Sequence, residues 1–307
     1  MDIQLPSCTL SGRYKIIVTD KGGSKRISNW FDNLVTDLGL DQISNVPLGT
    51  GSVPYLLTQA YVGTGDAPVA VSDVSLSEYL SSSDVVETTG TSSYVAGNPP
   101  YWRYVRTFTF AAGTVTGTLS EVGVGYTKDT LFSRALITDA LGEVSPVKVL
   151  ADEGIQLVYE LRSYINPNDV NQLVTIDGNI PSLSEIYNVV IRPAAMTSAK
   201  TINIGVGYAH TNVALYSGDI QNNTLVPLGS STSLTTYVTP VAYAPGSFTS
   251  NVSFSFATTS GNYAGGVKAV RISNSQCDFQ IGITPPIIKM SSMRLTMTFS
   301  LKYGRSP

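Results

Sequence analysis

PVKVLADEGIQLVYEL, residues 146–161, is one of two related stretches that set the architecture of this chain. From Ile155 to Leu161 every second residue is apolar, and this alternation predicts a β-strand that buries one face. The stretch PIIKMSSMRLTMTFSL repeats the pattern without a gap 140 residues later, in residues 286–301. The four apolar positions of the first copy match Leu295, Met297, Phe299 and Leu301.

Two more pairs of segments extend the repeat in the same order. FTFAAGTVTGTLSEVGVG (residues 108–125) resembles FSFATTSGNYAGGVKAVRI (residues 254–272), and LFSRALI (residues 131–137) resembles CDFQIGI (residues 277–283). Runs rich in Val, Thr, Tyr and Phe alternate with Gly, Pro, Asn and Ser clusters, as in β-sandwiches. We therefore expect an all-β fold of two tandem antiparallel β-sandwich domains that arose by internal duplication. Convergent patterning of unrelated strands is the alternative.

A short N-terminal helix is expected in SNWFDNLVTDLGLDQI, residues 28–43. Ser28 or Asn29 is a candidate N-cap, and Gly39 is a candidate residue just beyond the helix end. The apolar stripe makes this segment a candidate docking element, and its residues are Trp30, Phe31, Leu34 and Leu38. The predicted domains are residues 1–50, which pack on the first sandwich, residues 51–168 and residues 169–307.

The composition is unusual for a freely diffusing enzyme, because only 13% of the 307 residues are charged. The net charge of −3 is uneven: residues 220–307 hold six bases and one acid, Asp278, so they carry +5 and the rest carries −8. Such an asymmetry suits packing between copies, and compositional drift explains it equally well.

Cys8 and Cys277 lack metal-site spacing, and two buried thiols are expected rather than a disulfide. With no secretory signal or membrane span, the chain is expected to be soluble and made in a reducing cytoplasm.

Candidate catalytic chemistry is sparse. The one histidine, His210, has no neighbouring Cys, Asp or Glu, and no G-x-S-x-G motif occurs. VGTGDAP, residues 62–68, lacks the Lys-Ser/Thr and the helix of a phosphate-binding loop, so a tight turn is expected. We predict no catalytic, cofactor-binding or metal-binding residue, no enzyme activity, and no nucleic-acid partner.

An aromatic and cationic cluster lies in YVAGNPPYWRYVR, residues 94–106. Three interpretations are open: a strand with alternate aromatics in the core, which is favoured, an anchor at a protein interface, or a platform that stacks on sugar rings. The candidate interface residues are Tyr101, Trp102, Tyr104 and Arg106.

Blocks within residues 12–165 resemble structural proteins of tailed double-stranded DNA bacteriophages, of the tail, neck or fibre type. The blocks are GRYKIIVTDKGG, NWFDNLVTDLGLDQI, AYVGTGDAPVAVSDVSL, RYVRTFTFAAGTVTGTLSEVGVG, LFSRALITD and GEVSPVKVLADEGIQLVYELRSY. The resemblance implies a non-enzymatic virion component, assembled in the bacterial cytoplasm, whose partners are copies of itself and other virion proteins. The alternative is a receptor- or glycan-binding tail appendage used in host adsorption.

Overall fold

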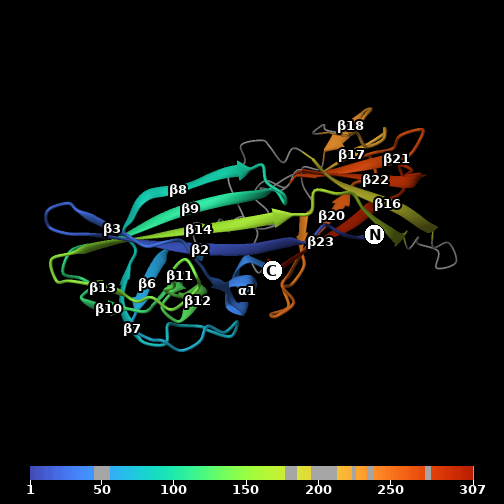
Figure 1. The fold of residues 1–307 in the computed structure, drawn as a ribbon. Coiled ribbons are helices and arrows are strands. Elements are labelled where there is room, and N and C mark those ends of the chain that lie inside the picture. The colour runs from blue at the N-terminus through green and yellow to red at the C-terminus, as the bar shows by residue number, and fades with distance from the viewer. Residues whose placement is uncertain are drawn as a thin grey trace.

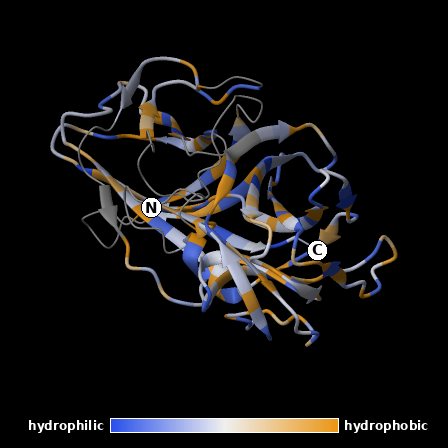
Figure 2. Cartoon of the chain, turned by 90° about the vertical axis from the view of Figure 1, so that its left-hand side faces the viewer, coloured by the Kyte–Doolittle hydropathy of each residue, from blue (hydrophilic) through white to orange (hydrophobic). Residues whose placement is uncertain are grey.

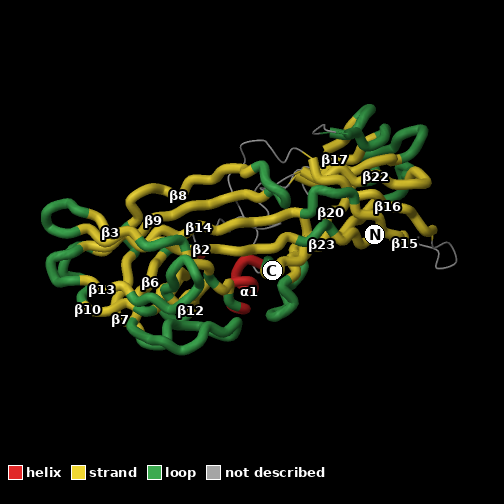
Figure 3. Tube along the Cα trace, viewed as in Figure 1, coloured by secondary structure: helices red, strands yellow, loops and turns green. Residues whose placement is uncertain are grey.

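The computed structural model describes residues 1–44, 56–176, 185–194, 213–222, 226–233, 238–273 and 278–306. Within these ranges the chain consists of β-strands, connecting loops and one α-helix, so the expected all-β fold is confirmed (Figure 3). Apolar and polar residues alternate along many strands, as the hydropathy colours in Figure 2 show. Strand β2, for example, buries every second residue over its twelve positions.

A large sheet runs through the whole molecule (Figure 1). Its main path has the order β19-β20-β23-β2-β14-β9-β8, and three short strands, β1, β3 and β4, pair at the sides of β23 and β2. The strands are β1 (Asp2–Gln4), β2 (Cys8–Thr19), β3 (Lys25–Ile27), β4 (Phe31–Asp32), β8 (Val86–Val95), β9 (Tyr101–Phe110), β14 (Gly154–Ile165), β19 (Val238–Pro240), β20 (Thr249–Phe256) and β23 (Leu295–Arg305).

Two further sheets form the second layer, one in each half of the molecule. The first has the order β5-β12-β11-β6-β7, and the second has the order β15-β16-β22-β21-β17-β18. The first-half strands are β5 (Leu34–Val35), β6 (Gln59–Gly63), β7 (Tyr79–Ser83), β11 (Glu121–Thr127) and β12 (Thr130–Leu136), with a separate two-stranded antiparallel sheet of β10 (Gly117–Leu119) and β13 (Val147–Val149). The second-half strands are β15 (Val170–Ile176), β16 (Glu185–Ala194), β17 (Val213–Tyr216), β18 (Ser231–Ser233), β21 (Val267–Ser273) and β22 (Asp278–Ile287).

The second half repeats the strand pairing of the first. In the large sheet β9 pairs with β14 so that Phe110 lies opposite Ile155. Strand β20 pairs with β23 in the same register, so that Phe256 lies opposite Leu295, the two residues that the sequence repeat matched to Phe110 and Ile155. In the second layer the order β5-β12-β11-β6-β7 recurs as β16-β22-β21-β17-β18. Eight strands therefore recur in the same chain order with equivalent neighbours, which favours duplication over convergent patterning.

The two halves are joined by the N-terminal strands. Strand β2 pairs along its whole length with β14, and its first three residues, starting at Cys8, also pair with β23 in parallel. Strand β1 adds to β23 in parallel as well. Both halves contribute to one continuous apolar core. The predicted limits at residues 50 and 168 stay a prediction, and the structure adds that the N-terminal segment belongs to both halves of the sheet.

The helix is shorter than predicted and begins later. It is α1 (Asp37–Ser44), and Thr36 is its N-cap, because the Thr36 hydroxyl accepts a hydrogen bond from the Gly39 amide at 2.9 Å. The preceding residues form β4 and β5 because their backbones pair with β2 and β12 instead. Gly39 lies inside the helix rather than after it. A Cβ at this position would lie 2.3 Å from the Phe132 carbonyl oxygen, so the close packing of α1 on β12 requires glycine.

Candidate functional site

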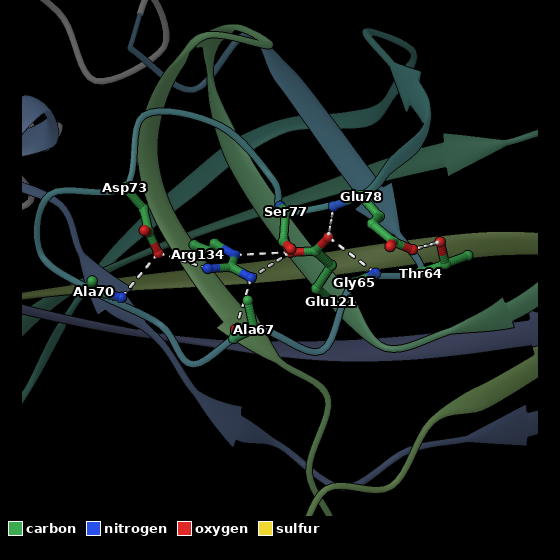
Figure 4. Close-up of polar contacts among 9 residues, drawn as sticks. All are labelled: Thr64, Gly65, Ala67, Ala70, Asp73, Ser77, Glu78, Glu121 and Arg134. Atoms are coloured by element: carbon green, nitrogen blue, oxygen red, sulfur yellow. Dashed lines mark hydrogen bonds and ion pairs between the residues drawn. The ribbon is translucent and has the colours of Figure 1, made fainter.

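The most buried polar cluster lies between the loop of residues 64–78 and the strands β11 and β12 (Figure 4). At its centre the Arg134 guanidinium, which is 2% exposed, contacts the Glu121 carboxylate, which is fully buried. Arg134 Nε donates a hydrogen bond to Glu121 Oε2 at 2.8 Å, and Arg134 Nη1 donates to Asp73 Oδ2 at 2.7 Å. Arg134 Nη2 donates to the Ala67 carbonyl oxygen at 3.0 Å. One guanidinium therefore binds the loop at two points, Ala67 and Asp73.

The Glu121 carboxylate also organises the loop backbone. It accepts hydrogen bonds from the amides of Gly65 at 3.2 Å, Ser77 at 3.0 Å and Glu78 at 2.7 Å. Cβ atoms at Gly63 and Gly65 would lie 2.7 and 2.5 Å from Glu121 Oε1, so glycine is required for the loop to close on the carboxylate. The glycines of VGTG thus enclose a side-chain anion of the same chain.

The role that this geometry supports is a structural one, the anchoring of the 64–78 loop. The buried charges of Glu121 and Arg134 neutralise each other, and the carboxylate is saturated with donors, which is how proteins tolerate buried ions. Within the residues that the structure describes, no three His, Cys, Asp or Glu side chains gather in a way that could hold a metal ion. The expected tight turn at residues 62–68 is wrong, because Val62 and Gly63 end β6 and residues 64–68 begin a long loop that is held by Glu121.

The aromatic cluster of residues 94–106 is divided between the two faces of β9. Trp102 is 2% exposed and Tyr104 3% exposed, and both belong to the core. They cannot offer ring faces to a sugar or a partner, so the favoured core interpretation holds for these two candidate residues. Arg106 points to the same inner side, over the Phe108 ring at 5.4 Å from its centroid. Tyr101 is the one candidate of this cluster that points outward.

The four candidate docking residues are also separated. Phe31 lies in β4 and is buried against Tyr14, with ring centroids 6.0 Å apart. Leu34 lies in β5 and Leu38 in α1, both partly buried, and Trp30 lies just before β4 on the outer face of the large sheet. They do not form one helical stripe, because an i, i+4 spacing has no meaning along a segment that is largely extended.

A second polar cluster lies on the outer face of the large sheet and was not predicted. Its centre is Glu160 of β14, whose side chain is 1% exposed. Arg13 Nε and Arg162 Nε donate hydrogen bonds to Glu160 Oε1 at 3.0 and 2.7 Å. Arg103 Nη1 lies 3.9 Å from Glu160 Oε2. Burial alone would raise the pKa of Glu160, but the hydrogen bonds and charges of Arg13 and Arg162 outweigh it and lower this pKa.

Aromatic rings extend this cluster on both sides. The Arg13 guanidinium lies 4.2 Å and the Lys15 ammonium 4.8 Å from the centre of the Trp30 ring. On the other side Arg162 lies 5.0 Å from the centre of the Tyr101 ring, and the rings of Tyr101 and Tyr164 are 5.3 Å apart. We call this set the cationic face, and it consists of Arg13, Lys15, Trp30, Tyr101, Arg103, Arg162 and Tyr164. The pattern in the sequence that could have predicted this face is the presence of charged residues at alternate positions of β2, β9 and β14.

The remaining candidates give no further site. The buried Cys8 Sγ lies 3.0 Å from Ser163 Oγ, while Cys277 and His210 lie outside the described residues. No helix in the described part of the chain is long and apolar enough to cross a membrane. Comparison with known proteins found no matching family model, no matching curated protein and no matching solved structure.

Proposed function

We propose that this chain is a non-enzymatic structural subunit of a tailed-phage virion, which oligomerises and forms or decorates the tail or neck or anchors fibres. The proposal begins from the resemblance of residues 12–165 to such proteins. Its partners are copies of itself and other virion proteins, and its location is the virion.

The observation that carries the proposal is that the blocks behind the resemblance meet in space. VGTG contributes Gly63 and Gly65, SEVGVG contributes Glu121, and LFSRALI contributes Arg134, and these four residues form one buried cluster. NLVTDLGL joins them, because Thr36 donates a hydrogen bond to the Leu131 carbonyl oxygen at 2.6 Å. Blocks that are tied together by packing constitute one structural unit, and this supports a shared fold module better than independent short matches would.

The test is the stoichiometry of the protein in assembled particles. Particles purified from a lysed culture are analysed by quantitative mass spectrometry, and the isolated protein by sedimentation velocity. A structural subunit is expected at a fixed copy number in particles or as a defined multimer in solution. Absence from particles together with a monomer at every concentration would refute the proposal.

The alternative, a receptor- or glycan-binding appendage, is supported by the outward pair of Tyr101 and Tyr164 beside Arg162, because neighbouring tyrosine rings and a guanidinium suit saccharide recognition. Because Trp102 and Tyr104 are buried, the test of this alternative substitutes the two outward tyrosines instead. Tyr101→Ala with Tyr164→Ala should abolish cell adsorption while particle assembly persists. Unchanged adsorption by particles that carry both substitutions would exclude this alternative.

A further inference from the structure

One segment of the chain has a strongly one-sided charge. Residues 27–102 contain eight acidic residues and no Lys or Arg. Three of the acids lie next to the edge strand β7 and are exposed: Asp66 in the loop before it, Glu78 directly before it, and Asp84 directly after it. Among the described strands β7 pairs with β6 alone, so no described strand pairs with its other side.

The same edge exposes apolar side chains. Three large ones lie in β7 or just after it, each at least 38% exposed, and they are Tyr79, Leu80 and Val85. Surface patches that combine a free strand edge, apolar side chains and one sign of charge are typical of protein interfaces. We call this surface the acidic edge.

The cationic face is complementary to the acidic edge, because it is positively charged and also exposes apolar side chains. Three of its four cations, Arg13, Arg103 and Arg162, surround the buried carboxylate of Glu160, and their side chains remain 28%, 42% and 23% exposed. Asp32 and Glu87 border the face, but among the described residues neither forms an ion pair with it, and Glu87 accepts a hydrogen bond from Gln156 at 2.7 Å. Trp30, Tyr101 and Tyr164 supply apolar area between the cations.

The two surfaces belong to opposite layers of the first sandwich. On β2 the inward Tyr14 hydroxyl is 2.6 Å from Ser133 Oγ of β12, so the alternate residues Arg13 and Lys15 point away from the second layer. The acidic edge is part of that second layer. One copy therefore cannot bring its own acidic edge onto its own cationic face, whereas two copies can bring them together.

We propose that the acidic edge of one copy binds the cationic face of a second copy in a head-to-tail contact. This inference rests on the proposed structural function. Because the contact joins two different surfaces, each of the two bound copies keeps its other surface available for a further copy. Such a contact generates a ring if the rotation closes and a filament if it does not. Charge complementarity aligns the copies and makes the contact sensitive to salt.

The test uses full-length variants that alter one surface each. The face variant is Lys15→Glu with Arg103→Glu, which keeps both hydrogen-bonding arginines on Glu160. The edge variant is Asp66→Lys with Asp84→Lys. The matched controls are Lys128→Glu, on an exposed turn between β11 and β12, and Glu143→Lys, on another exposed loop. Circular dichroism and thermal unfolding verify that every variant folds as the wild type does.

Sedimentation velocity of each protein, alone and mixed, gives the result. We expect a wild-type multimer that high salt weakens, unchanged controls, and a dissociation constant raised at least tenfold in the face and edge variants. Mixing these two variants should restore association, because the intact edge of the face variant can bind the intact face of the edge variant. Multimers of wild-type mass in both variants would overturn the proposed contact and leave the structural function standing.

Two other outcomes also overturn the contact. A wild-type protein that is monomeric alone, yet present in particles at fixed stoichiometry, would refute it without touching the structural function. A face variant that keeps its mass but no longer binds an immobilised acidic polysaccharide would assign the cationic face to a glycan instead of a second copy.

Discussion

Removal of the Arg134 side chain should be among the most destabilising single changes in the first half of the molecule. Arg134→Met keeps the apolar stem of the side chain but leaves the fully buried Glu121 without its guanidinium. Breaking a buried ion pair from one side costs about 3–5 kcal/mol. A domain of this size loses roughly 2–4 °C of Tm per kcal/mol, so Tm should fall by roughly 6–20 °C.

A second substitution separates charge from packing. Glu121→Gln removes the buried negative charge but keeps an oxygen that can accept from the loop amides. We therefore expect the double variant Arg134→Met with Glu121→Gln to be more stable than Arg134→Met alone, with a coupling free energy of about 0.5–3 kcal/mol. The measurement is urea unfolding followed by circular dichroism for the wild type, both single variants and the double variant.

A surface ion pair provides the control. Arg192 and Asp169 are joined by a pair whose side chains are 25% and 35% exposed, and Arg192→Met should cost only about 0–1 kcal/mol. If Arg134→Met costs no more than Arg192→Met, or if Glu121→Gln fails to recover any stability in its presence, the Arg134 cluster does not hold the loop as described.

Three further predictions concern packing and pH. Gly39→Ala should destabilise the protein by about 1–3 kcal/mol, because the new methyl group meets the Phe132 carbonyl oxygen, and equilibrium unfolding would reveal a cost near zero if this contact is wrong. Trp102→Ala should cost about 3–5 kcal/mol, whereas Tyr101→Ala on the outer side should cost much less, and equal losses would contradict their opposite orientations. Because the pKa of Glu160 is lowered in the folded state, its contribution to stability is present above the unfolded pKa and is lost as the pH falls through the folded pKa; Glu160→Gln should therefore flatten the acid side of a stability-against-pH curve, and an unchanged curve would refute the role of its arginines.

Local patterns in the sequence predicted the strands well where burial follows a strict alternation. The repeat of residues 146–161 in residues 286–301 was found from such an alternation, and the strands β14 and β23 bury the matched residues. The same method failed before α1. Trp30, Leu34 and Leu38 have helical spacing, but β2 and β12 provide hydrogen-bond partners for two short strands there, and pairing with distant strands overrides local helical preference.

The two polar clusters could not be predicted from local patterns. Arg13 and Glu160 are 147 residues apart, and they meet only because β2 inserts beside β14. Arg134 and Asp73 are 61 residues apart and meet because the loop before β7 folds back over β12. VGTG was predicted to be a tight turn, and its role in binding Glu121 was missed, since the anion that its glycines enclose lies in another strand.

The sequence by itself determined the all-β class, the alternation of buried residues in the strands, and the repetition of the two halves, because these follow from the period-two geometry of a strand and from side-chain polarity. Only the tertiary structure decided that the N-terminal strands join both halves, that Trp102 and Tyr104 point inward, and that cations gather on one face of the large sheet. The physical reason is that strand pairing depends on hydrogen bonds and packing between residues far apart in the chain. A strand's own residues show that it has two faces, and its partners determine which of them is buried.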